Sequence, residues 1–117
     1  MSEITILNPS APVEKRAQSR KRVFMGGVVV YEEGLCSFAC TIRNMTEVGA
    51  RIAIPRWQVF PAIVYLISIK TERAYAARVA WAGEREAGLT FIDSFDLKDA
   101  RPDIAYLQKI WNTHSLQ

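Results

Sequence analysis

The alternation of apolar and polar residues along the chain is typical of short β-strands. Between residues 36 and 43, apolar side chains occupy every second position, which is the period of a half-buried strand. Further runs rich in β-branched and aromatic residues are separated by turns that contain glycine, proline or charged residues. The pattern predicts six strands, at about residues 23–31, 35–44, 49–54, 63–70, 73–82 and 87–93.

The last segment of the chain changes to a helical period. An apolar stripe with spacings of three, three and one is formed by Ile104, Leu107, Ile110 and Trp111. We therefore expect a helix over about residues 97–112, with Asp96 or Asp99 as its N-cap and Pro102 in its first turn.

Short strands at close spacing predict a mainly β fold, a six-stranded antiparallel barrel with the C-terminal helix packed on it. Side chains fill the interior of such a small barrel, so a ligand must bind outside it. We expect the helix to cover one mouth of the barrel.

The first two strands are predicted to form a hairpin around Glu32-Glu33-Gly34. If Tyr31 pairs with Leu35, partner numbers add up to about 66, because antiparallel partners count in opposite directions. Arg22 then faces Asn44. A bulge at residues 26–27, which are both glycine, would shift this pairing by only a residue or two.

Positive charge is concentrated just before this hairpin. Residues 15–22, called the basic arm here, hold five basic side chains and no acidic ones, in Lys15, Arg16, Arg20, Lys21 and Arg22. The formal charge of the whole chain is only +3, so the remainder is net negative. A local cluster of this kind indicates one anionic partner at one site, or else a solvated basic segment.

The remaining composition narrows the class of protein. The length of 117 residues suits one domain, with residues 1–14 as a flexible tail and residues 15–113 as the folded part. No apolar run reaches the ~18 residues of a membrane span, and the start lacks the features of a secretory signal, so we expect a soluble cytoplasmic protein. Cys36 and Cys40, four apart on one strand, would lie about 13 Å from each other, too far for a disulfide, and we interpret both as buried apolar residues.

The chain offers no pattern for catalysis or for a metal. Its single histidine, His114, is three residues from the end, and no serine or cysteine has a visible base partner. No phosphate-binding glycine loop and no zinc-ligand spacing are present. We expect a binding protein without catalytic residues, metal or cofactor.

Two polar clusters, at the ends of the hairpin strands, resemble the paired signature of the PilZ family. The family pattern is R-x-x-x-R, a pair of strands, and then D/N-x-S-x-x-G. Arg16 and Arg20 match the first half, and Asn44 and Gly49 match the second, where Thr46 replaces the usual serine. The resemblance spans about residues 14–93, including Arg-Val-Ala-Trp at 78–81 and Gly-Leu-Thr-Phe at 88–91.

PilZ domains are bacterial receptors for cyclic di-GMP, so the resemblance implies a role in second-messenger signalling, such as the regulation of motility or biofilm formation. It implies that Arg16, Arg20, Asn44, Thr46 and Gly49 bind the dinucleotide. Arginine suits this ligand because its planar donors fit both phosphate oxygens and the guanine O6 and N7 edge.

The other basic residues, Lys15, Lys21 and Arg22, would add less directed attraction. The resemblance also implies an unknown downstream protein, to which ordering of the basic arm would signal. Glycine at position 49 would permit a positive φ and close approach of the ligand.

Other interpretations remain open. The chain could be a PilZ-like interaction module that does not bind cyclic di-GMP, since the extra methyl of Thr46 could crowd the ligand. Nonspecific nucleic-acid binding by the basic arm is less favoured, because no aromatic residues are interleaved with it. Arg43 and Arg51 could enlarge the basic face, but arginines on strand surfaces are common. Trp81 is expected in the core, and Trp57, in a loop, is left undecided.

Overall fold

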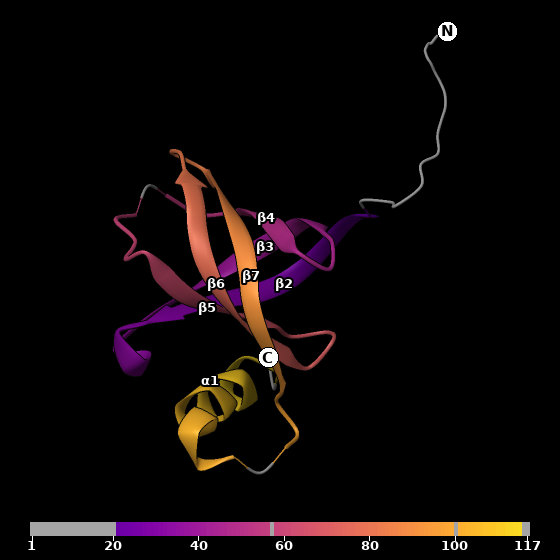
Figure 1. Cartoon of the computed structure of the whole chain (residues 1–117), viewed down its shortest axis with the longest axis vertical. Coiled ribbons are helices and arrows are strands. Elements are labelled where there is room, and N and C mark those ends of the chain that lie inside the picture. The colour runs from indigo at the N-terminus through magenta and orange to yellow at the C-terminus, as the bar shows by residue number, and fades with distance from the viewer. Residues whose placement is uncertain (1–20, 57, 100, 116–117) are drawn as a thin grey trace, which may run out of the picture.

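The protein forms a closed barrel of six antiparallel strands followed by a C-terminal helix (Figure 1). The computed structural model describes residues 21–56, 58–99 and 101–115. Around the barrel the strands run in the order β2-β3-β4-β7-β6-β5, and β5 pairs with β2 to close it. Their bounds are β2 (Lys21–Tyr31), β3 (Cys36–Met45), β4 (Gly49–Ala53), β5 (Ile63–Ser68), β6 (Arg73–Ala82) and β7 (Glu86–Asp96). The predicted mainly β barrel is confirmed. The predicted tail over residues 1–14 lies outside the described residues.

The β2–β3 hairpin has the predicted turn and nearly the predicted register. A short 3-10 helix, Glu32–Gly34, joins the strands, and Tyr31 pairs with Cys36 rather than with Leu35. A one-residue shift lies between Arg22 and Met25, slightly before the predicted position at residues 26–27. The two offsets cancel, so Arg22 pairs with Asn44 as expected.

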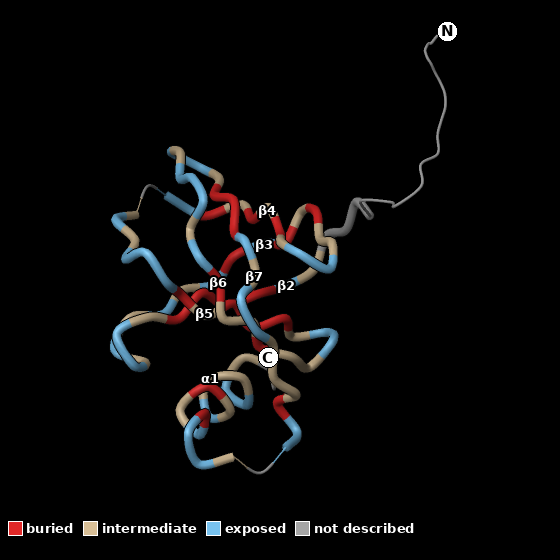
Figure 2. The backbone as a smooth tube through the Cα atoms, viewed as in Figure 1, coloured by how far each residue is buried: buried red, intermediate tan, exposed pale blue. Residues whose placement is uncertain are grey.

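Three consecutive valines in β2, Val28, Val29 and Val30, are all fully buried because they contribute to two different cores. Val29 points into the barrel interior with Ile42, Ile52 and other residues. Val28 and Val30 point outward and are covered by helix α1 (Ala105–Ser115). Burial on both faces explains why this strand shows no alternation in the sequence. Figure 2 shows separate buried stretches, in red, on several of the strands.

Helix α1 packs on the outer wall of the barrel, not over a mouth as predicted. Its Leu107, with Ile104 just before it, joins Ile67, Ala74 and Leu97 in the second core, on the outward faces of β2, β5 and β6. The expected start near residue 97 is also wrong: a 3-10 turn, Pro102–Ile104, precedes α1.

The reason for the late start lies in the segment after β7. The Oδ1 of Asp96 accepts a hydrogen bond from the backbone N–H of Lys98, at 2.9 Å, so this carboxylate closes a turn and does not cap a helix. The side chain of Gln108 then donates to the Leu97 carbonyl at 3.0 Å and holds the connection against α1. None of the helical segments in the described residues has the length and apolar character needed to cross a membrane.

Candidate functional site

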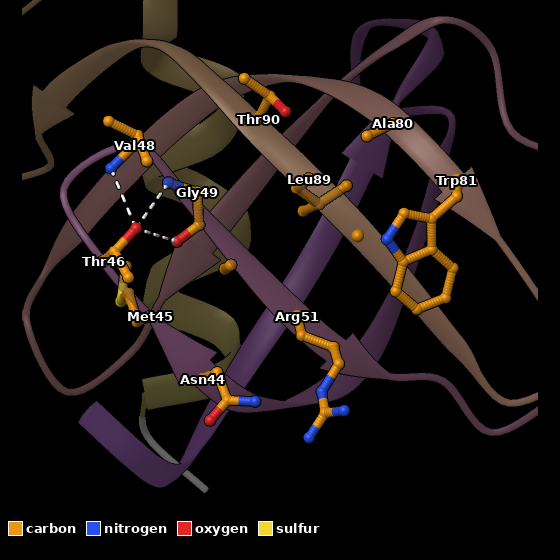
Figure 3. Close-up of a pocket in the computed structure, with 12 residues that line it drawn as sticks. Asn44, Met45, Thr46, Val48, Gly49, Arg51, Ala80, Trp81, Leu89 and Thr90 are labelled. Atoms are coloured by element: carbon orange, nitrogen blue, oxygen red, sulfur yellow. Dashed lines mark hydrogen bonds between the residues drawn. The ribbon is translucent and has the colours of Figure 1, made fainter. Parts of the chain in front are cut away.

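A pocket of about 460 Å³ lies on the outside of the barrel, where the β3–β4 turn meets β6 and β7 (Figure 3). It is lined by Asn44, Met45, Thr46, Val48, Gly49, Ala50, Arg51, Ala80, Trp81, Gly88, Leu89 and Thr90. Three residues that the sequence pattern singled out, Asn44, Thr46 and Gly49, therefore meet at one pocket. Helix α1 contributes none of the lining residues.

The side chain of Thr46 holds the β3–β4 turn together. Its Oγ1 accepts hydrogen bonds from the backbone N–H groups of Val48 and Gly49, each at 3.2 Å, and donates to the Gly49 carbonyl at 3.3 Å. The backbone N–H of Thr46 donates to the same carbonyl at 2.9 Å. A hydroxyl has one donor and two acceptor sites, so the turn uses all three.

Gly49 is required by the close approach of two strands. A Cβ at this position would collide with the carbonyl oxygen of Leu89 on the neighbouring β7. The positive φ expected at Gly49 is not found. Among the described glycines, Gly34 is the one with a positive φ. The turn is also tied to β7 by a 2.8 Å hydrogen bond from the Phe91 N–H to the Val48 carbonyl. The motif glycine thus lets the turn dock on β7.

Asn44 is directed out of the barrel by a β-bulge. Ile42 lies in the interior, and simple alternation would place Asn44 there too, but the β3–β4 register shifts by one residue between them. Asn44 consequently pairs with Arg51, whose neighbours Ala50 and Ile52 point inward. Bulges commonly redirect side chains next to functional sites in this way.

The amide of Asn44 holds the guanidinium of Arg51. Both ends of the amide find complementary partners in the orientation opposite to that drawn in Figure 3. Its oxygen then accepts from Nε of Arg51 at 3.1 Å and from Nη2 at 2.9 Å, while its nitrogen donates to the Arg43 carbonyl at 3.2 Å. The Nη1 of Arg51 lies 3.9 Å from Oε1 of Glu86.

Trp81 forms part of the pocket, and the prediction that it lies in the core is wrong. Val79 packs against the interior, but a one-residue register shift between Val79 and Trp81 directs the indole outward, where the residue is 48% exposed. Trp81 pairs with Gly88, and a Cβ on Gly88 would overlap the indole ring. The missing side chain at position 88 therefore makes the space in which the ring lies.

The last two residues of the basic arm, Lys21 and Arg22, are the first residues of β2. The backbone of Lys21 pairs with Met45, and that of Arg22 pairs with Asn44, so the first residues of β2 run beside the pocket. Lys15, Arg16 and Arg20 lie outside the described residues, as does Trp57.

The lining of the pocket combines apolar residues with a few polar groups. Among the described lining residues Arg51 carries the only charge, and none is a histidine, cysteine or carboxylate that could transfer a proton or attack a substrate. Aspartate, glutamate, histidine and cysteine do not form a metal-binding group of three or more anywhere in the described part of the chain. The lining instead offers a guanidinium, a hydroxyl on Thr90 and an exposed aromatic ring.

The two thiols lie away from this pocket. Burial raises the pKa of the Cys40 thiol to about 12, in agreement with its predicted place in the core. Cys36 is only partly buried, so the prediction that both are buried is wrong for this residue. A 3.2 Å hydrogen bond from its Sγ to the Glu32 carboxylate raises the pKa of this thiol.

Two residues of the pocket, Arg51 and Trp81, were not predicted from the sequence as part of the site. A usable signal existed for Arg51, because it follows Gly49 by two residues and must share the outward face of the same strand. For Trp81 no such signal exists, since a bulge leaves no mark in the alternation of apolar residues.

The comparisons with known proteins support the fold. No family model matches the chain, and no curated protein sequence matches it. Among solved structures, the chain is similar to the PilZ domain of CeSA from a cellulose-synthesizing bacterium, with a TM-score of 0.52 and 12% sequence identity. The match covers 82% of this chain and 98% of that domain. The barrel with its C-terminal helix therefore has a PilZ-like fold.

Proposed function

We propose that this protein is a bacterial cytoplasmic receptor for cyclic di-GMP, a binding module without catalytic activity. The proposal rests mainly on one observation: two parts of the chain that are distant in sequence lie side by side at the pocket. Asn44, Thr46 and Gly49 line one pocket, and β2, which continues directly from the basic arm, pairs beside them. The PilZ-like fold supports the same function.

The ligand would be bound between the barrel wall and the basic arm. The pocket floor supplies Arg51, Trp81 and the docked turn, and the arm would supply Arg16 and Arg20 for the phosphates and guanines. Arginine is suited to both tasks because its guanidinium forms paired hydrogen bonds and stacks on aromatic bases. Lys15, Lys21 and Arg22 would add electrostatic attraction.

Binding would be converted into a signal by the arm. An arm that becomes ordered around the dinucleotide presents a changed surface to a partner protein, and the ordering would control motility or biofilm formation through that partner.

One observation favours a second candidate, a PilZ-like interaction module that does not bind the dinucleotide. The hydroxyl of Thr46 is fully used by its own turn, so it has no hydrogen-bonding capacity left for a ligand in this arrangement. The turn would then serve only to shape the surface.

Isothermal titration calorimetry with cyclic di-GMP distinguishes the two candidates. We expect saturable binding of cyclic di-GMP, but not of GTP or single-stranded DNA, and a loss of at least tenfold in affinity, about 1.4 kcal/mol, for Arg20→Ala. Lys109→Ala is the matched control, because it removes one positive charge from the exposed face of α1. Absence of heat at high protein concentration would refute the receptor and favour the interaction module.

A further inference from the structure

We propose that Arg51 is a further ligand-contacting residue, which binds a phosphate group of the dinucleotide, and that Asn44 acts as a positioning residue for it. This inference rests on the proposed function and deepens it. The starting observation is that Arg51 carries the only charge among the described lining residues, on a side chain that is 41% exposed.

The geometry leaves one edge of the guanidinium available. Arginine has five N–H donors, and the Asn44 oxygen accepts from two of them, on Nε and Nη2. The Glu86 carboxylate, 3.9 Å from Nη1, is beyond hydrogen-bonding distance. The remaining donors lie on Nη1 and Nη2, the pair that binds two oxygens of one phosphate in parallel.

The charge of Arg51 is also preserved. Its close partner is a neutral amide, which orients the guanidinium without cancelling its charge. Glu86 is an acidic neighbour whose side chain is 39% exposed, and an ion pair this long and this solvated contributes little. An anion entering the pocket therefore meets a net positive group that is already oriented.

The orientation has an energetic benefit. An arginine side chain carries about 2 kcal/mol of rotamer entropy, part of which a ligand must overcome when it fixes the side chain. The paired hydrogen bonds from Asn44 restrict Arg51 before the ligand arrives.

Asn44 itself is poorly placed to contact a ligand. It is only 8% exposed, and its amide is bonded at both ends, to Arg51 and to the Arg43 carbonyl. Asn44 would therefore contribute to affinity by orienting Arg51, and not by contacting the ligand itself.

The test is calorimetric titration of the full chain with cyclic di-GMP at about 0.1 M and 0.5 M salt. We expect Arg51→Ala to weaken binding at least tenfold at the lower salt concentration and by a smaller factor at the higher one, because salt screens an ionic contact. Arg51→Lys should recover only part of the affinity, because lysine lacks the planar pair of donors. Arg85→Ala, an exposed arginine outside the lining, should bind like the unmodified protein.

A double-mutant cycle tests the role of Asn44. Asn44→Ala should weaken binding several-fold alone and cause no further loss in the Arg51→Ala background. Urea unfolding of each variant checks that the fold is retained, and Arg51→Lys keeps the test valid if Arg51→Ala is unstable.

The outcomes separate the two proposals. Tight binding that Arg51→Ala and Arg51→Lys leave unchanged overturns this inference but not the receptor function. An equal loss at both salt concentrations overturns the phosphate assignment, and additive losses overturn the positioning role of Asn44. If the unmodified protein does not bind cyclic di-GMP, the receptor function and this inference both fall.

Discussion

Replacing Gly49 by alanine tests whether this residue serves the fold or the ligand. The added Cβ would collide with the Leu89 carbonyl oxygen, which belongs to the backbone of β7 and cannot rotate away. Overpacking typically costs 1–3 kcal/mol, and separating the strands also strains the Thr46–Gly49 hydrogen bonds, each worth about 1 kcal/mol. We expect a loss of about 3 kcal/mol in the free energy of unfolding.

Urea and thermal unfolding, followed by far-UV circular dichroism, measure this loss. For a chain of 117 residues, about 3 kcal/mol corresponds to a fall in Tm of about 12 °C. Gly26→Ala is the matched control, because a Cβ there would meet only the Ile69 Cδ1, at an ordinary contact distance of 3.6 Å. Alanine at position 26 should be neutral or slightly stabilising.

A structural role for Gly49 is refuted if Gly49→Ala is as stable as the unmodified protein, or if both alanine variants lose the same stability. A variant that is stable but no longer binds cyclic di-GMP would instead show that position 49 acts through the ligand.

Two further predictions concern Gly88 and Cys40. Gly88→Ala should displace the Trp81 indole from the pocket and shift the tryptophan emission. The free energy of unfolding should fall by only about 1 kcal/mol, because the displaced ring is a side chain that can move. An emission spectrum that is unchanged, or that shifts equally in a Trp81→Phe background, contradicts this prediction. Burial raises the pKa of the Cys40 thiol to about 12, against about 8.5 for an unfolded cysteine, so the folded state holds the proton more tightly and stability falls as the pH rises above about 8.5. Between pH 8 and 10 the unmodified protein should lose about 2 kcal/mol more than Cys40→Ala in urea unfolding, and equal losses would refute this assignment.

Most strands could be predicted because an apolar face leaves its period in the sequence, whereas β2 could be predicted only from its run of β-branched and aromatic residues. The pairing of Arg22 with Asn44 could be predicted as well, by counting outward from the turn. That count succeeded because the hairpin tip and the shift before Met25 displace the register by one residue in opposite directions.

The pocket could be predicted only in part. Asn44, Thr46 and Gly49 were identified by a motif, but Asn44 and Trp81 point into the same pocket because a bulge precedes each of them. A bulge inserts one residue and reverses the faces that follow, while the amino-acid pattern remains that of an ordinary strand. The start of helix α1 was predicted too early because an aspartate such as Asp96 can either cap a helix or close a turn.

The position of α1 on the outer wall has a consequence for how the protein folds during synthesis. The chain emerges N-terminus first, so all six strands are available before α1. Until then Val28, Val30 and Ile67 form an apolar strip on the outside of the barrel, open to water and to other chains. Helix α1 therefore covers the surface through which barrels would otherwise associate. A chain halted before residue 105 would be prone to aggregate.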